Sequence, residues 1–261
     1  MTTMHTHPLD LSGRVAVVVG GTSGLGRALA KGLARAGADV VATGRREGLA
    51  GEVASEIEAL GRRSLVHGVD VSDRASIDRL RDVVLGTFGE IDILLNAAGK
   101  TKRIPSKDFP EQEWQSIFDA NVTGMLRACQ SFYEPLRKNR RGRIINIASL
   151  TSYVAFHEVA AYSASKAAVL SLTQSLGCEW AKDGINVNAI APGVFKTPLN
   201  EHLITGTPRG NELLMRTPMG RFGTPDELVG AAILLASDAA SFITGQCLAV
   251  DGGFLASGVN S

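Results

Sequence analysis

Seven short apolar runs, rich in β-branched residues, divide this 261-residue chain into repeating units. The run VAVVV, at residues 15–19, has no polar position at all. Such a continuous run is typical of a strand that is buried on both faces of a parallel sheet. We therefore predict strands at residues 15–19, 39–43, 64–69, 91–95, 143–148, 185–190 and 247–250.

The segments between these runs carry apolar residues every three or four positions, which is the spacing of one helix face. After the first run, Leu25, Leu29 and Leu33 recur every four residues before Gly37, a typical helix stop. The same pattern predicts helices near residues 49–60, 77–84, 111–136, 161–181 and 225–236. The helix at 111–136 is expected to be interrupted or bent near its Thr-Gly pair at 123–124.

Strands that alternate with helices at this spacing form βαβ units, and right-handed crossovers combine such units into a doubly wound parallel sheet. We find no internal repeat and no linker between domains. We therefore predict a single α/β domain over residues 1–261, with a parallel sheet of about seven strands flanked by helices.

One irregular stretch, residues 196–222, follows the sixth predicted strand. It holds several glycines and prolines around a short apolar helix signal at 213–215. In an open α/β sheet, ligands bind outside the carboxyl ends of the strands, where this stretch begins. We predict a mobile lid over the substrate. The alternative is a surface or subunit-contact insertion without a gating role.

The charge balance gives no support for a polyanionic partner. The chain has 27 Lys and Arg residues against 26 Asp and Glu residues, a net charge of +1. No apolar run reaches the roughly 18 residues of a membrane-spanning helix, and the start of the chain lacks the apolar core of a signal peptide. We therefore predict a cytoplasmic protein that binds neither nucleic acid nor membrane.

Cysteine and histidine show no pattern of disulfide or metal chemistry. Cys129, Cys178 and Cys247 are far apart and each lies in an apolar stretch, so we expect three buried free thiols. The five histidines show no HExxH or comparable spacing, so we predict no metal site.

A glycine-rich turn, GGTSGLG at residues 20–26, joins the first predicted strand to the first predicted helix. Glycines at this point permit a tight turn and the close approach of a pyrophosphate to the helix N-terminus, whose free N–H groups favour anions. The spacing is GxxxGxG, and a glycine cluster alone is a weak signal because many turns are glycine-rich. Its position between strand and helix predicts dinucleotide binding.

The second predicted strand ends in Thr43-Gly44-Arg45-Arg46. A carboxylate at this point would bond the adenosine ribose hydroxyls and repel a 2′-phosphate, but the sequence has an arginine pair instead. Guanidinium groups suit phosphate. We therefore favour NADP(H), with NAD(H) possible because Gly44 allows both. The alternative is that the arginines are merely solvated at a helix start.

Two further predicted strands end in residues that suit a cofactor. Asp70 and Val71 follow the third, where a carboxylate can accept from the adenine amino group. The sequence NAAG at 96–99 follows the fourth, where small residues let a cofactor lie against the backbone. Alternatively, Asp70 could be a helix N-cap and 96–99 a plain turn. Because the carboxyl ends of parallel strands share one edge, we predict the site there.

Tyr162 and Lys166 lie four residues apart in a predicted helix, and therefore on one face, one turn apart. A phenol works as an acid or base near neutral pH only if its pKa falls from about 10. A fall to about 7 needs about 4 kcal/mol of differential interaction, whereas an exposed lysine supplies about 1 kcal/mol. The pair is therefore expected in a partly desolvated cleft with further positive charge nearby.

These motifs together resemble the short-chain dehydrogenase/reductase family, with a Rossmann-type domain of about 250 residues, over nearly the whole chain. Ser149 precedes Tyr162 by 13 residues, the separation that this family uses. Val19 and Ala97 depart from the family pattern, which often has threonine and asparagine there. The matching pieces are residues 20–26, Asp70-Val71, Asn96 to Gly99, Asn121, Ser149, Tyr162 to Lys166 and Pro192-Gly193.

The resemblance implies a role for each of four residues. Tyr162 is the general acid or base at the substrate oxygen, and Ser149 hydrogen-bonds that oxygen. Lys166 lowers the pKa of the tyrosine and bonds the nicotinamide ribose, and Asn121 holds a water that links Lys166 to solvent. The cationic oxidised nicotinamide supplies the further positive charge. The expected cofactor-binding residues are Gly20, Thr22, Ser23, Gly24, Leu25, Gly26, Arg45, Arg46, Asp70, Val71, Asn96, Ala97, Gly99, Tyr162, Lys166, Pro192, Gly193, Val194 and Thr197.

Within that family the chain is most similar to the gluconate 5-dehydrogenase and deoxy-keto-gluconate dehydrogenase branch. This implies a secondary alcohol and a ketone of a sugar acid, keto-sugar or polyol as the reacting pair, and a homotetramer. The expected substrate residues are Ser149, Tyr162, Arg103, which could meet a sugar-acid carboxylate, and His157. Arg103 could equally be a solvated loop residue.

Two other functions stay open from the sequence. A 3-oxoacyl-thioester reductase uses the same catalytic set together with a docking patch for a carrier protein. A non-catalytic dinucleotide-sensing protein shares the fold but has no need of Ser149, Tyr162 and Lys166, so their joint presence argues against it.

Overall fold

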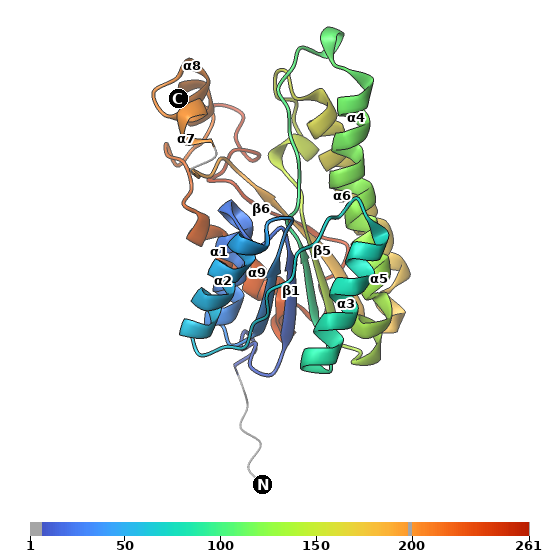
Figure 1. Cartoon of the computed structure of the whole chain (residues 1–261). Helices are drawn as coiled ribbons and strands as arrows, with labels where there is room; N and C mark the ends of the chain where they lie inside the picture. Colours follow the sequence, from blue (N-terminus) through green and yellow to red (C-terminus); the bar gives the residue numbers. More distant parts are fainter. Residues whose placement is uncertain (1–6, 198–199, 261) are drawn as a thin grey trace.

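Six parallel strands form the central sheet of the computed structural model, which describes residues 7–197 and 200–260 (Figure 1). Their order in the sheet is β2-β1-β3-β4-β5-β6, so the chain leaves β1 in one direction and returns to its other side. This reversal confirms the predicted doubly wound α/β fold. The strands are β1 Val15–Val19, β2 Asp39–Thr43, β3 Ile93–Asn96, β4 Gly142–Ile147, β5 Ile185–Pro192 and β6 Cys247–Val250.

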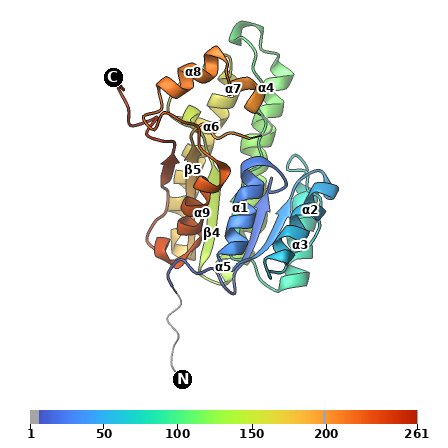
Figure 2. The same cartoon turned by 90° about the vertical axis from the view of Figure 1, so that its left-hand side faces the viewer.

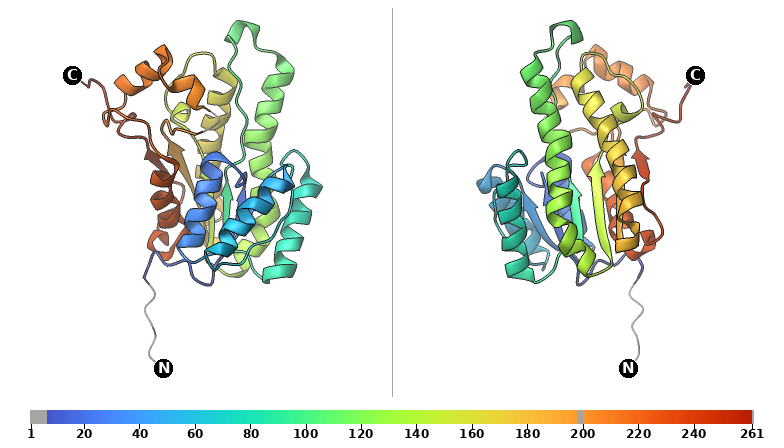
Figure 3. Two further views of the ribbon diagram at one scale, coloured as in Figure 1. Left: turned by 60° about the vertical axis from the view of Figure 1, so that its left-hand side comes forward. Right: turned by 90° about the vertical axis from the view of Figure 1, so that its right-hand side faces the viewer.

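Helices cover both faces of this sheet, as the two views in Figure 3 show. No helix in the described residues is long and apolar enough to cross a membrane. One face carries α1 Gly24–Arg35, α2 Glu47–Ala59 and α9 Val229–Ala236. The other carries α3 Arg74–Phe88, α5 Gly124–Lys138 and α6 Ala160–Glu179.

The alternation of side chains along β1 explains why both faces are covered. Val15, Val17 and Val19 point to one cluster of buried residues, whereas Ala16 and Val18 point to the other. All five are buried. A strand with no polar position therefore needs helices on both sides, as the run VAVVV predicted.

The prediction of a strand at residues 64–69 was wrong, and the sheet has six strands rather than about seven. This segment runs beside β2 but makes only one isolated bridge, between Gly44 and Gly68. Side chains replace the backbone ladder: Ser64 Oγ donates to Val40 O at 2.7 Å, and Thr43 Oγ1 donates to His67 O at 2.5 Å. These side chains thus bond backbone carbonyls in place of a regular ladder of backbone pairs.

The predicted interruption of the long helix at 111–136 is confirmed. It consists of α4 Glu111–Phe118, a π-helical turn Asp119–Thr123, and α5. A π turn holds one residue more than an α turn and often occurs at functional sites. Asn121 lies in the middle of this turn and is 2% exposed.

The segment after β5 carries α7 Glu201–Ile204 and α8 Pro208–Met215, beyond the carboxyl edge of the sheet (Figure 2). Of the lid predicted at 196–222, residues 198 and 199 lie outside the described residues. The segment has its own small apolar cluster, separate from the two clusters on the sheet. Ile204 and Leu213 pack there with Leu150 and Phe254. The segment that carries α7 and α8 thus rests on the loop after β4 and on the C-terminal tail.

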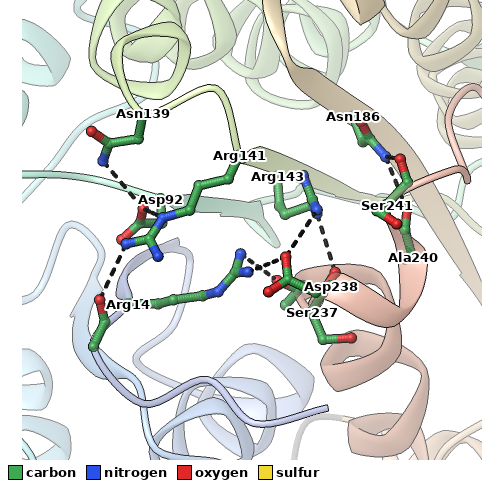
Figure 4. Close-up of polar contacts among 12 residues, drawn as sticks. Arg14, Asp92, Asn139, Arg141, Arg143, Asn186, Ser237, Asp238, Ala240 and Ser241 are labelled. Carbon is green, nitrogen blue, oxygen red and sulfur yellow. Dashed lines mark hydrogen bonds and ion pairs between the residues drawn. The ribbon is translucent and has the colours of Figure 1, made fainter. Parts of the chain in front are cut away.

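A cluster of buried arginines lies at the amino end of the sheet (Figure 4). Arg14 and Arg143 are 3% and 4% exposed and share the carboxylate of Asp238, at 2.5 and 3.6 Å. They also donate to the carbonyls of Ala236 and Ser237, both at 3.3 Å. Cations at a helix C-terminus are stabilised by the helix dipole. The cluster therefore fastens β1 and β4 to the end of α9.

The expectation of three buried cysteines was only partly right. Cys129 is buried, but Cys178 is exposed on α6 and Cys247 is half-buried in β6. All three are free thiols. The edge position of β6 explains Cys247, because no seventh strand covers that side of the sheet in the described residues.

Candidate active site

The turns after β1 and β3 meet where the strand order reverses, and glycine is required at that contact. Gly20 has a φ of 85°, and a Cβ there would lie 2.4 Å from the Ala98 backbone N. A Cβ on Gly26 would lie 2.1 Å from the Gly20 carbonyl oxygen. Both distances are far below van der Waals contact. The two glycines therefore let the backbone fold into a narrow cradle at the switch point of the sheet.

The N-terminus of α1 opens into this cradle with its N–H groups uncapped. Ser23 is the N-cap residue but its side chain makes no capping hydrogen bond, and the first turn carries no acidic residue. A Cβ on Gly24 would meet nothing within 4 Å. Open space, free N–H groups and a positive helix end together fit a pyrophosphate. Leu25 is half-buried and Thr22 is buried beside them.

A cleft of about 530 Å³ continues the cradle along the ends of β2 and the 64–69 segment. Arg45 lines it together with Glu47 and Asp70. Arg45 and Arg46 are exposed, and within the described residues neither belongs to an ion pair. The Glu47 carboxylate, which the sequence analysis missed, accepts from Gly68 N at 3.3 Å. Arg45 thus faces the cleft beside a carboxylate.

Asp70 and Val71 form the floor next to this cleft. Asp70 Oδ1 accepts from Ser72 N at 2.9 Å and from Ser72 Oγ at 2.7 Å. These two bonds, followed by the nearby charge of Arg45, hold the pKa of Asp70 below its ordinary value. The carboxylate is therefore ionised and able to accept a further hydrogen bond. A Cβ on Gly124 would lie 2.9 Å from the Val71 side chain, so Val71 packs directly against α5.

In the NAAG segment, residues 96–99, Asn96 and Ala97 make structural contacts, and Gly99 lies at the site. Asn96 turns away from the cradle, because its Nδ2 donates to Asn146 Oδ1 at 2.9 Å and to Cys129 Sγ at 3.4 Å in the interior. Ala97 N donates to Val19 O at 2.8 Å, which ties this turn to the end of β1. Gly99 lies beside the catalytic candidates: a Cβ there would be 3.5 Å from Asn121 Oδ1.

Asn121 connects three segments by its side chain. Its Oδ1 accepts from Lys100 N at 2.7 Å, and its Nδ2 donates to Lys100 O and Ser165 Oγ, both at 2.9 Å. Ser165 Oγ in turn donates to the Tyr162 carbonyl at 2.7 Å. The π turn therefore fixes both the loop after β3 and the helix that carries the tyrosine.

Lys166 is 5% exposed, and its Nζ donates to Ile147 O at 2.6 Å at the end of β4. Burial lowers the pKa of Lys166 to about 8. The Nζ atom lies 5.8 Å from the centroid of the Tyr162 ring. Tyr162 and Lys166 thus lie on one face of α6, as their spacing predicted, and the lysine is shielded from solvent.

Tyr162 itself is half-buried, and burial raises the pKa of its phenol. The hydrogen bond with Ser149 opposes that rise. Ser149 lies directly after β4, where its Oγ also accepts from Thr151 N at 3.2 Å. The protein by itself therefore does not bring the phenol pKa near neutrality. This agrees with the expectation that Lys166 alone is insufficient and that further positive charge is needed.

The end of β5 closes the far side of the cradle. Gly193 N donates to Val250 O at 2.8 Å, and a Cβ on Gly193 would lie 2.6 Å from the Asp251 Cα. Pro192 is the last residue of β5, and the Val194 carbonyl accepts from Gly223 N at 2.9 Å. Thr197 N and Oγ1 both contact Asn200 Oδ1, at 2.9 and 3.1 Å.

The two substrate candidates differ in their surroundings. Arg103 Nε lies 2.6 Å from Glu158 Oε2, whereas the His157 side chain is 83% exposed and lies 3.8 Å from the same carboxylate group. Arg209 of α8 donates to the His157 carbonyl at 3.4 Å. The sequence analysis missed Glu158 and Arg209. Arg209 could have been found as a basic residue within the predicted lid, but no sequence signal points to Glu158.

No group of three or more His, Cys, Asp or Glu side chains in the described residues is arranged to hold a metal ion. The protein groups at this edge are instead a phenol, a hydroxyl, a buried amine and an amide, next to a dinucleotide cradle. Such groups can move a proton at an oxygen atom, and a nicotinamide held in the cradle would supply hydride transfer. Fold and site together define a nicotinamide-dependent oxidoreductase.

Comparison with known proteins places the chain within that class. Residues 19–255 match the family model described as enoyl-(acyl carrier protein) reductase. The chain is 39% identical over 254 residues to a 2-dehydro-3-deoxy-D-gluconate 5-dehydrogenase of Dickeya dadantii, covering 97% of this chain and 100% of that protein. It is 38% identical to the gluconate 5-dehydrogenase of Gluconobacter oxydans, covering 97% and 99%.

A solved structure shows the same likeness. The gluconate 5-dehydrogenase of Burkholderia cenocepacia, in complex with NADP and tartrate, superposes with a TM-score of 0.92 at 38% identity. The match covers 96% of this chain and 98% of that one. The chain belongs to the short-chain dehydrogenase/reductase family. It is an enzyme of the kind that acts on CH–OH groups.

Proposed function

We propose that this enzyme interconverts a secondary alcohol of a sugar acid and the corresponding ketone, with NADP(H) as cofactor. The observation that carries the proposal is the convergence of Ser149, Tyr162 and Lys166 beside the glycine cradle. Sugar-acid substrates are supported by the relatives, which are named for gluconate or 2-dehydro-3-deoxy-gluconate. Nothing in these names favours the 3-oxoacyl-thioester alternative.

Each protein group has a defined task in this reaction. Ser149 donates a hydrogen bond to the reacting oxygen and orients it. In the oxidative direction Tyr162 takes the hydroxyl proton, and in the reductive direction it returns that proton to the carbonyl oxygen. When bound, NADP⁺ accepts the hydride that leaves the carbinol carbon. Lys166 holds positive charge near the phenol, and Asn121 keeps the loop after β3 in place for proton exchange with solvent.

The protein residues that would hold the cofactor follow from the geometry. The glycine cradle and the free N–H groups of α1 take the pyrophosphate, Asp70 and Val71 take the adenine, and Arg45 and Arg46 take the 2′-phosphate. Support for NADP(H) comes from the exposed arginines and from the NADP in the B. cenocepacia structure. Glu47 in the same cleft opposes a phosphate, so NAD(H) remains usable.

A panel of substrates tests the proposed function. Gluconate, 5-ketogluconate, the neutral polyol glucitol and an acetoacetyl thioester are each assayed with NADP(H) and NAD(H). We expect turnover of the sugar acids with NADP(H) to exceed all other combinations. Turnover of the thioester alone would contradict the proposal.

Arg45→Ala tests how the cofactor is chosen. Loss of a charge-assisted contact to phosphate costs about 1.5–3 kcal/mol, so the affinity for NADPH should fall by about tenfold or more. Affinity for NADH should change little, as measured by cofactor fluorescence titration. The matched control is Lys31→Ala, which removes a cation of α1 that is paired with Glu56 outside the cleft. Equal losses for both cofactors would show that Arg45 does not read the phosphate.

We also propose a homotetramer that works in the cytoplasm. Apolar side chains are exposed along one edge of the molecule: Leu248 of β6 is 39% exposed, and Phe242 is fully exposed. Large exposed apolar side chains at a sheet edge suit a contact between subunits. The three free thiols suit a reducing compartment. Light scattering should give four times the 27.5 kDa of one chain.

A further inference from the structure

Glu158 adopts an unusual backbone conformation four residues before Tyr162. Its φ is 67°, in the left-handed region that long side chains rarely occupy. The conformation is held from outside, because Ile104 N donates to the Glu158 carbonyl at 2.9 Å. A residue held in this way at the edge of a site is often placed there for its side chain.

The Glu158 carboxylate lies among cations from two other segments. Arg103, from the loop after β3, approaches within 2.6 Å. Arg209, from α8 of the lid segment, is fixed through its bond to the His157 carbonyl and lies 6.0 Å from the centroid of the Phe156 ring. Burial lowers the pKa of Arg209, the charge of Arg103 lowers it further, and Glu158 acts in the opposite direction. Arg103 is thus paired with Glu158, and Arg209 lies close enough to feel the charge of both.

These three segments follow β3, β4 and β5, and so converge on the edge of the sheet where substrates bind in this fold. Glu158 precedes Tyr162 by four residues in the chain. The B. cenocepacia relative has tartrate, a dicarboxylate, in its complex with NADP. Guanidinium groups bind carboxylates through charge-assisted hydrogen bonds, so Arg103 and Arg209 suit a substrate carboxylate at this edge.

We propose that Glu158 is an internal stand-in for the substrate carboxylate, which displaces it from Arg103 and gains the nearby charge of Arg209 when a sugar acid binds. The inference rests on the proposed sugar-acid substrate and names the residue that limits affinity for it. Arg103 is 52% exposed and Glu158 24% exposed. An ion pair this exposed is weak enough to be exchanged for an external carboxylate. Glu158 therefore raises the KM for acidic substrates and leaves the KM for neutral substrates unchanged.

Glu158→Gln tests this directly, because it removes the charge while it keeps the side-chain length and the backbone strain. We expect the KM for gluconate to fall by about threefold, the effect of removing a half-exposed ion pair. The KM for glucitol, which has the same chain length and no carboxylate, should stay unchanged. Arg103→Ala and Arg209→Ala should each raise the KM for gluconate and leave that for glucitol unchanged.

Two control variants test whether the loss of any nearby carboxylate, or a change in backbone strain at position 158, could explain the result. Glu212→Gln removes another carboxylate near Arg209, from an exposed position on α8, and should leave both KM values unchanged. Glu158→Asn removes the charge with a residue that tolerates positive φ, and should act as Glu158→Gln does. An unchanged or raised KM for gluconate in both Glu158 variants would overturn the inference.

Tartrate binding separates the failure of this inference from the failure of the proposed function. Its affinity for the NADPH complex is measured by calorimetry, without turnover. If no sugar acid is turned over, the proposed function fails, and tighter tartrate binding by Glu158→Gln still supports the stand-in role. If sugar acids are turned over but tartrate binds wild type and Glu158→Gln with equal affinity, the stand-in role is refuted and the proposed function stands.

Discussion

At the residue scale, burial moves the pKa values of Tyr162 and Lys166 in opposite directions. It raises the pKa of the tyrosine and lowers that of Lys166 to about 8. In each case the neutral form gains, because a charge is costly away from water. With a pKa of about 8, Lys166 still carries its charge in most molecules at neutral pH, whereas the Tyr162 phenol is neutral. Further positive charge nearby would favour the ionised phenol. A cationic nicotinamide is such a charge, so acid–base readiness is coupled to cofactor binding.

Removal of the phenol should stop proton transfer without disturbing cofactor binding. We expect Tyr162→Phe to lower kcat by about 10²-fold or more, the usual contribution of a general acid or base. The dissociation constant of NADPH should stay within about threefold of wild type, a change of less than 1 kcal/mol. Tyr153→Phe, at a tyrosine that is 48% exposed after β4, is the matched control and should keep full activity. Activity of Tyr162→Phe near wild type would refute the assigned role.

The depressed pKa of Lys166 predicts a pH-dependent stability difference. An unfolded lysine has a pKa of about 10.4, and the folded value is about 8. Between these values the unfolded chain binds more protons, so the free energy of unfolding rises with pH. Relative to Lys166→Met, wild type should gain about 2 kcal/mol between about pH 7.5 and 9.5.

Urea unfolding at both pH values measures this difference. Comparison of the two proteins cancels other groups, such as Cys129, whose pKa burial raises to about 12. If the two stabilities changed in parallel with pH, the lysine would not be desolvated in the folded protein.

At the element scale, the π turn Asp119–Thr123 determines where Asn121 points. If residues 111–138 formed a regular α-helix, the residues after position 123 would be rotated about the helix axis from the positions that they now occupy relative to α4. The extra residue brings the Asn121 amide against Lys100 and Ser165 while α5 still packs on the sheet. The irregularity therefore serves the site rather than the fold.

Deletion of Ala120 should convert the π turn to α-helix while the flanking helices keep their faces. We expect helical content and oligomeric state to stay unchanged by circular dichroism and light scattering. Activity should fall by about a hundredfold, as for Asn121→Ala, because the link between the loop after β3 and α6 is lost. An active deletion variant would show that the position of Asn121 is not critical.

At the scale of the whole molecule, the two ends of the sheet have different tasks. The carboxyl end carries glycine turns, the uncapped N–H groups of α1 and the segment with α7 and α8. The amino end is closed by Arg14, Arg143 and Asp238, as Figure 4 shows. The pKa of Asp238 is lowered mainly by the hydrogen bond from Arg14. We therefore expect substitutions at the amino end to change stability and to leave the chemistry at the carboxyl end unchanged.

Asp238→Asn should destabilise the protein and leave the kcat of the folded enzyme unchanged. Two buried guanidinium groups lose their shared anion, which we expect to cost about 2 kcal/mol at neutral pH. The cost is below that of a fully buried pair because the Asp238 side chain is 68% exposed. A depressed carboxylate pKa gives stability above the unfolded value of about 3.9, and this stability is lost as pH falls through the folded value.

Denaturant unfolding at neutral and acid pH checks both statements. The matched control is Asp226→Asn, which removes an exposed carboxylate 3.8 Å from Arg35 and should cost little. Equal stability of Asp238→Asn and wild type at neutral pH would show that the two arginines need no anion.

The sequence by itself determined the features that depend on local spacing. Tyr162 and Lys166 had to share a helix face because they are four residues apart. The glycine cluster that begins at Gly20 marked the turn from the first strand to the first helix by its position between them. The repeated strand and helix patterns likewise specified the parallel sheet. The periodicity of a helix or strand determines which of its side chains lie next to each other on one face.

Only the tertiary structure decided the features that depend on packing between distant segments. Residues 64–69 do not form a strand, because side chains bond them to β2 in place of a backbone ladder. The Asn96 side chain points inward and donates to Asn146. The left-handed backbone of Glu158 and its meeting with Arg103 and Arg209 have no local signature. They arise because loops after three different strands converge at one edge, and such contacts are set by the assembled sheet rather than by the spacing of residues along the chain.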